Sequence, residues 1–517
     1  MTRVKKNLLA NGITNVWMPL VLFLSMRYYK QLMGDEGLGL VGLFMTLQVV
    51  CSLLNMGLDT ALNRELSRLS AGGNKQQAMA DTLATLQVVH WLLAAALIAV
   101  MVAAAPLAGR YWISAEHLSR QQIATVIILM GLALGLQLPT FLYSGGLMGL
   151  QHQVLLSVVN ILMYTLRFGG AVAVLMFVKP TLSWFFAWQA CTAGVHSLAV
   201  AVLLWQRMPT GVRGRPCWER LRSLRAFVAG NAGIVVTAIA LTQLDKLILS
   251  KWLDMGEFAY YSTASLVALA IYRIPMTTFA ALFPQMTHLA SRGEAEELKL
   301  LYHRGAQVLS VFVFPFAAVL AMFSGEVMLL WLGDRVFADN AAPLLTVLMA
   351  GAALHCIGNI PYALQLASGW TKLTFSVNLA AVAVMALLVV ALTSAFGPVG
   401  AAVGWAGTCA TTTVVTVPLM HKRLLAGELK SWAVGDVLAP MLAAVTAAAA
   451  VRLLMPADWP AVRQLPWIVA AGVVSLLSAG LAAKVTREWV LSRFGLMSSA
   501  PRGAAAATET DQSRAGG

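Results

Sequence analysis

Charged residues are scarce in this sequence. Of its 517 residues only 11% are Asp, Glu, Lys or Arg, while 59% are hydrophobic and the mean hydropathy is +0.75. Soluble domains carry roughly a quarter charged residues, and disordered or nucleic-acid-binding chains depend on charge even more. The composition therefore excludes a soluble enzyme, a nucleic-acid-binding protein and a disordered scaffold. It predicts an all-α, polytopic membrane protein.

Cysteine and catalytic motifs are scarce as well. Four of the five cysteines lie in apolar runs and the fifth, Cys217, lies in the most basic loop, so their spacing indicates neither a disulfide framework nor a metal site. P-loop, HExxH and GxSxG sequences do not occur. We therefore expect no ATP hydrolysis, no enzyme activity, no metal and no cofactor, with H⁺ or Na⁺ left open as a coupling ion.

Long apolar runs are what the sequence does contain. A membrane helix needs about 20 mostly apolar residues, and about fourteen such runs are present. The N-terminal run has no small-residue cleavage site and is expected to stay as the first helix. The expected spans are 12–32, 38–58, 80–106, 122–147, 154–178, 182–206, 226–252, 257–283, 305–331, 342–367, 372–395, 398–420, 434–455 and 465–484.

The net charge is +14, and the distribution of Lys and Arg among the loops predicts the orientation of these spans. With a cytoplasmic N-terminus, about 24 of the 36 Lys and Arg residues fall in inner segments and about eight in outer ones. The distribution predicts that both termini are cytoplasmic. Outer loops are short, so any function is expected to lie among the helices.

A faint internal repeat has an offset of about 220 residues. Glu36 aligns with Glu257, Pro139 aligns with Pro361, and other matches keep the same order. About six helices per repeat would make two parallel lobes related by an axis along the membrane normal. The expected parts are an N-terminal six-helix lobe, a basic cytoplasmic linker, a C-terminal six-helix lobe, two extra transmembrane helices and a disordered cytoplasmic tail, at 1–206, 207–225, 226–425, 426–491 and 492–517.

Four cations lie inside apolar runs: Arg27, Arg167, Lys246 and Arg273. A charge at mid-bilayer costs about 2.5 to 3.5 kcal/mol on insertion scales, so these are the default candidates for binding an anion in the interior. Arg27 and Lys246 lie one repeat offset apart. The alternative for Arg27 and Arg167 is that they snorkel or bind carbonyl groups as packing elements.

Two helices place polar side chains on the same face as their arginine. The polar companions are Asn160, Tyr164, Ser262 and Thr277. If 257–283 is one helix, its polar residues share a narrow arc. These faces are expected to line a wet or protein-filled interior.

Asp245 directly precedes Lys246. Adjacent helix positions point about 100° apart, so the two are expected not to pair with each other. Asp245 would then hold Arg27 or Arg273 in a salt bridge between lobes, or take a proton or Na⁺. Three histidines in apolar runs are expected to be hydrogen-bonded core residues: His90, His196 and His355. Segments 63–79 and 284–304 are expected to be amphipathic surface helices.

The runs that carry these residues resemble a known family. TQLDKLILSKWLDMGEFAYYSTASL at 242–266 and YRIPMTTFAALFPQMTHLASRGEAEELKLLYHR at 272–304 resemble the second-lobe signature of polysaccharide transporters, the lipid-linked oligosaccharide flippases. GDEGLGLVGLFMTLQVVCSLLNMGLDTALNREL at 34–66 is similar to their first-lobe counterpart. The superfamily includes the multidrug and toxin extrusion transporters and the peptidoglycan lipid II flippase.

The resemblance implies a V-shaped pair of lobes that open alternately to either face of the bacterial inner membrane. It implies a cationic central cavity for a polyprenyl-diphosphate-linked oligosaccharide, the precursor of lipopolysaccharide O-antigen or exopolysaccharide. Arg27, Lys246 and Arg273 match positions where such flippases carry cavity cations, whereas Arg167 comes from the polar stripe alone. Membrane lipids are expected partners, polysaccharide polymerase and chain-length machinery are candidate partners, and nucleic acid is not expected.

Two other functions stay open. The first is an ion-coupled exporter of small cationic compounds, against which the surplus of interior cations argues. The second is a membrane-embedded polysaccharide polymerase or glycosyltransferase. Such enzymes usually need a large outer loop or a soluble carboxylate-bearing domain, which this sequence lacks.

Overall fold

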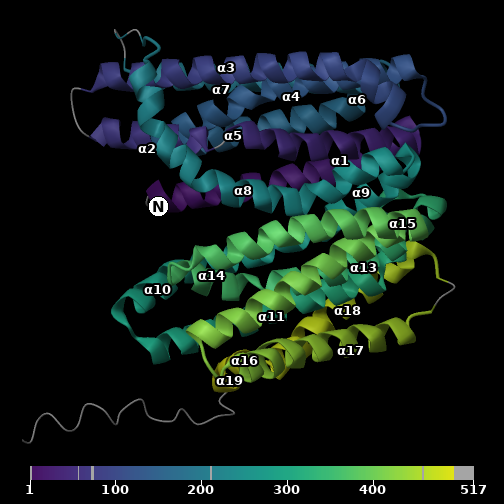
Figure 1. The fold of residues 1–517 in the computed structure, drawn as a ribbon. Coiled ribbons are helices and arrows are strands. Elements are labelled where there is room, and N and C mark those ends of the chain that lie inside the picture. Colours follow the sequence, from purple (N-terminus) through teal and green to yellow (C-terminus); the bar gives the residue numbers. More distant parts are fainter. Residues whose placement is uncertain are drawn as a thin grey trace, which may run out of the picture. The chain divides into compact units, whose positions relative to one another are not determined.

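Helices make up the regular structure of this protein. The computed structural model describes residues 3–55, 57–71, 75–209, 212, 214–456 and 459–493 (Figure 1). Within these ranges the one non-helical pairing is an isolated bridge between Ser114 and Asp254. An α-helix pairs its own backbone polar groups, which lipid cannot do, so apolar runs of this length fold as helices. The predicted all-α fold class is confirmed. The predicted tail at 492–517 lies almost entirely outside the described residues.

The helices follow one another along the chain with short connections. The N-terminal elements are α1 (Arg3–Cys51), η1 (Ser52–Asn55), α2 (Leu58–Ala71), α3 (Gln76–Leu107), η2 (Ala108–Trp112), α4 (Arg120–Gly149), α5 (Gln153–Tyr164), η3 (Thr165–Gly169), α6 (Gly170–Phe177) and α7 (Leu182–Arg207). The central elements are α8 (Trp218–Trp252), α9 (Met255–Leu269), η4 (Ala270–Tyr272), α10 (Arg273–Arg292), α11 (Ala295–Met322), α12 (Ser324–Leu332), α13 (Arg335–Ile357), α14 (Asn359–Ala367) and α15 (Thr371–Leu424). The C-terminal elements are α16 (Leu429–Ser431), η5 (Trp432–Leu438), α17 (Ala439–Leu454), α18 (Ala461–Ala482) and α19 (Lys484–Arg493).

Eleven helical segments among the described residues are long and apolar enough to cross a membrane. Two of them, Leu9–Asn55 and Thr371–Leu424, each cover two expected spans. They are interrupted at Gly34 (φ 72°) and Gly397 (φ 60°), a backbone region that glycine enters without a Cβ penalty. The expected spans coincide with helical parts of the described chain, although 257–283, 305–331 and 342–367 each run across a break between two helices. Fourteen as the number of crossings stays a prediction.

The interruptions repeat along the chain. Gly34 breaks α1, and about 220 residues later α8 ends before Leu253. Likewise α3 begins at Gln76 and α11 at Ala295. This order of helices and breaks is consistent with the internal repeat seen in the sequence.

The chain divides into two compact units. The first comprises Met1–Ala270, Phe323–Ala352 and Thr371–Thr416, and the second Ile271–Met322, Ala353–Trp370 and Val417–Gly517. Each unit is described by itself below. The lobe limits at 206 and 226 stay a prediction.

Close helix contacts shape the first unit. α3, α4 and α7 lie alongside one another (Figure 1), and α2 packs across them around Leu62, Leu83 and Leu142. A Cβ added to Gly145 of α4 would lie only 2.4 Å from the Asp59 carbonyl oxygen of α2. Small residues at such contacts let two backbones approach closely, which is how membrane helices pack without a hydrophobic driving force.

In the second unit, α11 is the central helix, and α17 and α18 pack against it. α10 and α11 form a hairpin whose turn has Gly293 in the left-handed conformation (φ 71°). The expected surface helix at 284–304 is therefore wrong, because this glycine ends α10 and α11 begins at Ala295. Segment 63–79 is also divided, since α2 ends at Ala71 and α3 begins at Gln76.

Candidate functional site

A small polar cavity lies in the first unit between α1, α8 and α9. Its volume is about 110 Å³. Two predicted site residues, Lys246 and Ser262, line it together. The other polar side chains in its lining are Thr46, Gln243 and Thr263. All five polar side chains are buried, and the other seven lining residues are apolar or glycine, so the name polar cavity refers to these five side chains.

Lys246 and Asp245 form an ion pair at this cavity. The Lys246 Nζ atom lies 3.2 Å from Asp245 Oδ2, and it also donates to the Thr242 carbonyl oxygen at 2.9 Å. The Tyr261 hydroxyl donates to Asp245 Oδ2 at 2.7 Å. Asp245 is 0% exposed and Lys246 5% exposed, so both charges depend on these partners.

This pairing contradicts the expectation that the two neighbours would not meet. The angle between adjacent helix positions describes where side chains leave the backbone, but the four-carbon stem of lysine bends back along its own helix. Burial favours the bent conformer, because an uncompensated buried charge is costly. The cavity thus holds a cation whose charge is balanced by Asp245.

Arg27 lies on α1 beside the end of α12. One turn before it, the Phe23 ring stacks on Trp331 with 4.2 Å between centroids, and Trp331 Nε1 donates to the Phe23 carbonyl oxygen at 2.7 Å. A Cβ built on Gly333 would lie 3.0 Å from Arg27 Nη2, so the guanidinium lies directly over this glycine. The Arg27 side chain is exposed. It is therefore accessible to an anion in a way that Lys246 is not.

One turn further along α1, Lys30 joins two acidic groups. Its ammonium contacts Asp35 at 3.0 Å and also pairs with Asp334, the residue that precedes α13. The hydrogen bond from Lys30 lowers the pKa of Asp334 below its usual value. Arg27 and Lys30 thus lie on the same stretch of α1, where it contacts the α12–α13 connection.

Arg167 is deeply buried in the first unit, on the π-helical turn η3. It is 3% exposed. Its Nε atom donates to Gln189 Oε1 at 2.6 Å and its Nη1 atom to Gln137 Oε1 at 2.9 Å. The Phe44 and Phe168 rings lie within 5.8 Å of the guanidinium carbon. The packing alternative expects such neutral partners, but the buried Nη2 atom has no hydrogen-bond partner among the described residues, so the role of Arg167 stays a prediction.

The polar stripe that contains Arg167 faces α7. His196 Nε2 lies 3.0 Å from Asn160 Oδ1, and the same imidazole meets the Tyr164 ring edge at 5.9 Å. The stripe therefore lies inside the protein, as its spacing indicated. Sequence reasoning missed the two glutamines that hold Arg167. Both are polar amides within apolar runs, Gln137 in LGLQLPTF and Gln189 in FAWQAC, and this feature of the sequence could have indicated them.

The prediction that the histidines in apolar runs are hydrogen-bonded inside the protein is confirmed for His196, and also for His90 and His355. His90 Nε2 lies 3.1 Å from Asn55 Oδ1. His355 Nδ1 lies 3.1 Å from the Tyr272 hydroxyl. Each imidazole is thus satisfied by a nearby polar group in its own unit.

Arg273 and Thr277 belong to the second unit, whereas Ser262 belongs to the first. Arg273 begins α10, and Thr277 Oγ1 donates to the Arg273 carbonyl oxygen at 2.9 Å. Both side chains are exposed. The assumption of one uninterrupted helix over 257–283 is wrong, because the 3₁₀ turn Ala270–Tyr272 separates α9 from α10.

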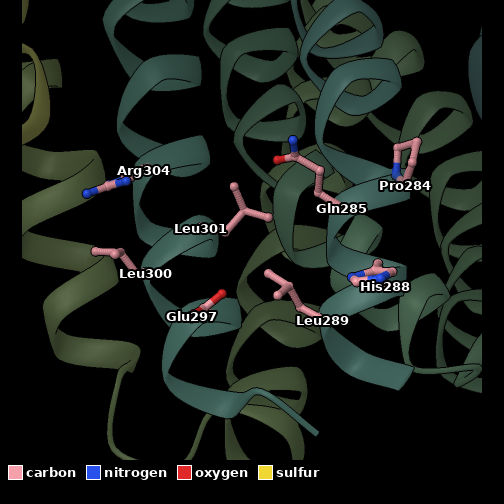
Figure 2. A pocket seen from close by; sticks show the side chains of 8 residues that line it. All are labelled: Pro284, Gln285, His288, Leu289, Glu297, Leu300, Leu301 and Arg304. Atoms are coloured by element: carbon pink, nitrogen blue, oxygen red, sulfur yellow. The ribbon is translucent and has the colours of Figure 1, made fainter. Parts of the chain in front are cut away.

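The α10–α11 hairpin encloses a groove of about 580 Å³ (Figure 2). Figure 2 shows the side chains of both helices around it. The charged lining residues are Glu297 and Arg304, with His288 and Gln285 as further polar groups. Its mixed charge favours no single class of ligand.

A second, partly buried polar cluster includes residues of α11. His303 Nδ1 lies 2.5 Å from Asp436 Oδ2 and its Nε2 atom 3.2 Å from Glu428 Oε2. Lys299 Nζ pairs with Glu428 at 2.6 Å and lowers the pKa of that carboxyl group. Because both ring nitrogens of His303 face carboxylates, both are placed to donate, which is the geometry of a charged imidazolium.

Gln307 extends this cluster to the last described helix. Its Nε2 atom donates to Asp436 Oδ1 at 2.7 Å, and its Oε1 atom accepts from the Val485 backbone N–H at 2.9 Å. The cluster therefore joins α11 to η5 and α19. Sequence reasoning missed it, although an acidic residue within the expected span 434–455 is as unusual as Asp245.

The chain is similar in sequence to a known protein family. Residues 30–339 match the profile of a family described as polysaccharide biosynthesis proteins. The chain belongs to this family. A curated relative from Shigella flexneri, named a putative O-antigen transporter, is 22% identical over 189 residues, which is 37% of this chain and 44% of that protein. The match thus spans less than half of the curated relative.

Solved structures show which fold this chain has. The lipid II flippase MurJ in an inward closed conformation aligns with a TM-score of 0.72 at 11% identity, over 94% of this chain and 99% of that one. An inward-facing multidrug resistance MATE family transporter of the MOP superfamily aligns at 0.60 and 13% identity, over 80% and 94%. This chain is therefore a multi-pass membrane protein with the fold that these two solved structures share.

Proposed function

We propose that this protein is a flippase for a lipid-linked oligosaccharide. It would move a polyprenyl-diphosphate-linked oligosaccharide from the cytoplasmic to the outer leaflet of the bacterial inner membrane by alternating access, without making or breaking a bond. The observation that carries the proposal is the family match over residues 30–339 on a chain with a flippase-like fold. Polysaccharide synthesis needs its lipid-linked precursors on the far side of that membrane.

The cations that lie within apolar helices support this proposal. A diphosphate that crosses the hydrocarbon core loses its hydration, and charge-assisted hydrogen bonds from protein cations replace it. Arg27 and Arg273 are exposed on their helices and are the first candidates for this contact. Lys246 would join them only when its ammonium is released from Asp245.

That release suggests how an ion would couple to transport. A proton or Na⁺ that binds Asp245 competes with Lys246 for the same carboxylate. Binding of the ion would leave the Lys246 ammonium free for an anion in the cavity. Asp245, Lys246 and Tyr261 are thus the proposed coupling residues.

The test is complementation of a strain that lacks the gene. Arg27→Gln and Arg273→Gln variants should abolish surface polysaccharide while protein levels in the membrane stay normal. Arg335→Gln is the matched control, because Arg335 is 75% exposed and pairs with Asp339 on its own helix. Normal polysaccharide from both the Arg27→Gln and the Arg273→Gln variants would contradict the site assignment.

A second candidate function rests on the MATE-like fold. An exporter of small cationic compounds would use the same alternating access. Interior cations repel cationic cargo, which favours the flippase. If loss of the gene raises drug susceptibility and leaves surface polysaccharide unchanged, the exporter is the correct function.

A further inference from the structure

An apolar pocket of about 300 Å³ lies in the first unit between α1, α3, α4 and α8. Its lining includes Leu43, Leu47, Met101, Leu107, Ile127 and Leu247. The pocket has about ten times the volume of one water molecule, roughly 30 Å³, yet its walls offer water almost no polar partners. A hydrocarbon chain is the occupant that such walls favour.

One end of the pocket carries a cation and aromatic rings. Lys251 lines it, with its Nζ atom 5.7 Å from the Trp112 ring centroid. Trp112 Nε1 donates to Ser250 Oγ at 3.0 Å, which fixes the indole between η2 and α8. Arg110, two residues before Trp112, lies over the Tyr111 ring. Lys, Arg and aromatic residues gather where a membrane helix meets the headgroup layer.

The pocket also opens outward from the bundle. Leu107 is 59% exposed and Tyr111 63% exposed, although both line it. The Lys251 side chain is exposed too. A chain can thus enter from the lipid while an attached phosphate stays at Lys251.

Apolar pocket and polar cavity share two helices. On α1, Thr46 faces the polar cavity and Leu47 the apolar pocket; on α8, Lys246 and Leu247 are divided in the same way. A molecule with a phosphate head and an apolar tail matches this pair of neighbouring sites. The pocket has room for a segment of one chain, so a two-chain phospholipid would leave one chain outside.

We propose that this pocket binds the polyprenyl chain of the lipid-linked substrate next to its phosphate, and that Lys251 holds that phosphate. The inference rests on the proposed function. By the predicted orientation, Lys251 lies at the outer face, so the pocket holds the lipid after its head has crossed. It is a site for the product before release.

The experiment uses the purified full-length protein in lipid nanodiscs. The probe is a polyprenyl diphosphate with a photoreactive group near its first isoprene unit, and labelled peptides are identified by mass spectrometry. Labelling should fall on residues of η2, α3 and α8 around the pocket. Competition with unlabelled polyprenyl diphosphate should remove it, whereas equal removal by phosphatidylglycerol would show a general lipid site and overturn the proposal.

Two pairs of variants test the residues. Ala104→Trp fills the pocket, and Ala103→Trp adds the same side chain at the adjacent, exposed position outside it. Lys251→Gln removes the anchor, and Lys179→Gln removes an exposed lysine that is also predicted to lie outside. Each pocket variant should lower labelling about tenfold. Lys251→Gln does so because one charge-assisted hydrogen bond is lost, and Ala104→Trp because the chain can no longer enter the pocket. Equal labelling within both pairs would overturn the proposal.

Failure of this inference and failure of the proposed function give different results. If the pocket is not labelled but surface polysaccharide still requires the gene, the flippase function stands without this site. If polysaccharide is normal without the gene, the flippase function itself fails. Because Lys251 is exposed, Lys251→Gln is not expected to unfold the protein, so its result is readable even if Ala104→Trp does not fold.

Discussion

At the scale of residues, the buried pair of Asp245 and Lys246 is the main source of new information. The two residues are adjacent in the sequence and almost completely buried. The Asp245 carboxylate pairs with the Lys246 ammonium and also accepts a hydrogen bond from the Tyr261 hydroxyl. A buried pair of this kind contributes little when intact, but removing one partner leaves an isolated charge. Its stability effect is therefore highly asymmetric.

This asymmetry gives a prediction for Asp245. Asp245→Ala leaves the Lys246 ammonium buried without its counterion, and should lower the free energy of unfolding by about 3 to 5 kcal/mol. Tyr261→Phe removes one hydrogen bond to a charged group and should cost about 1.5 to 3 kcal/mol. Denaturant unfolding of the purified protein in detergent measures both.

Asp339→Ala is the control for that comparison. It removes a carboxylate from an exposed pair with Arg335, and such pairs contribute about 0 to 1 kcal/mol. If Asp245→Ala were no more destabilising than Asp339→Ala, the ion pair at the polar cavity would be refuted.

At the scale of elements, ionic contacts connect helices that are distant in sequence. Lys30 of α1 reaches Asp334, which precedes α13 and also accepts from the Phe337 backbone N–H at 3.0 Å. The pKa of Asp334 is lowered, so its carboxylate is stabilised in the folded protein. A pKa that is lower in the folded than in the unfolded protein adds stability at pH values above the unfolded-state pKa. The stabilising contact is therefore lost as the pH falls.

The pH dependence follows directly. The contribution of Asp334 is fully present above about pH 4, the unperturbed Asp value, and is lost as pH falls below it. Wild type should therefore lose more thermal stability between pH 5 and pH 3 than Asp334→Asn, in which this group no longer titrates. Parallel melting curves for the two proteins would disprove the contact between α1 and α13.

The sequence predicted positions of helices far better than contacts between them. Apolar runs located the expected spans in helical parts of the chain, because a bilayer imposes a similar length on any segment that crosses it. The Gly293 turn and the 3₁₀ turn at 270–272 were missed, since each rests on one or three residues within an otherwise helical pattern.

The site was predicted in part for a similar reason. Because burying a charge is costly, Lys246 and Arg167 can be picked out from the sequence. The direction in which a flexible side chain points cannot be predicted in the same way. His303 and Asp436 are 133 residues apart, so nothing local in the sequence indicates that they meet. Long-range pairs become visible only once the helices are packed.

At the scale of the whole molecule, orientation in the membrane is the property that decides what the cavity and the pocket do. The positive-inside distribution predicts cytoplasmic termini. Residue 222 lies in the predicted basic linker and residue 179 in a predicted outer loop. Both side chains are exposed, which makes them suitable labelling positions.

Cysteine labelling in intact cells tests this orientation. Lys179→Cys, in a background without the native cysteines, should react with a membrane-impermeant maleimide added outside. Arg222→Cys should react only after the membrane is permeabilised. The reverse pattern would invert the topology and would place Lys251 at the cytoplasmic face.

The ion pair at the polar cavity has an electrical consequence. Moving one elementary charge across the membrane potential involves about 2.3 kcal/mol per 100 mV. Asp245 and Lys246 are neighbours on α8 and would travel together through that field, so their opposite charges do no net electrical work. If the proposed flippase function is correct, the voltage sensitivity of translocation would then come from the proposed diphosphate substrate and from any ion that separates the pair.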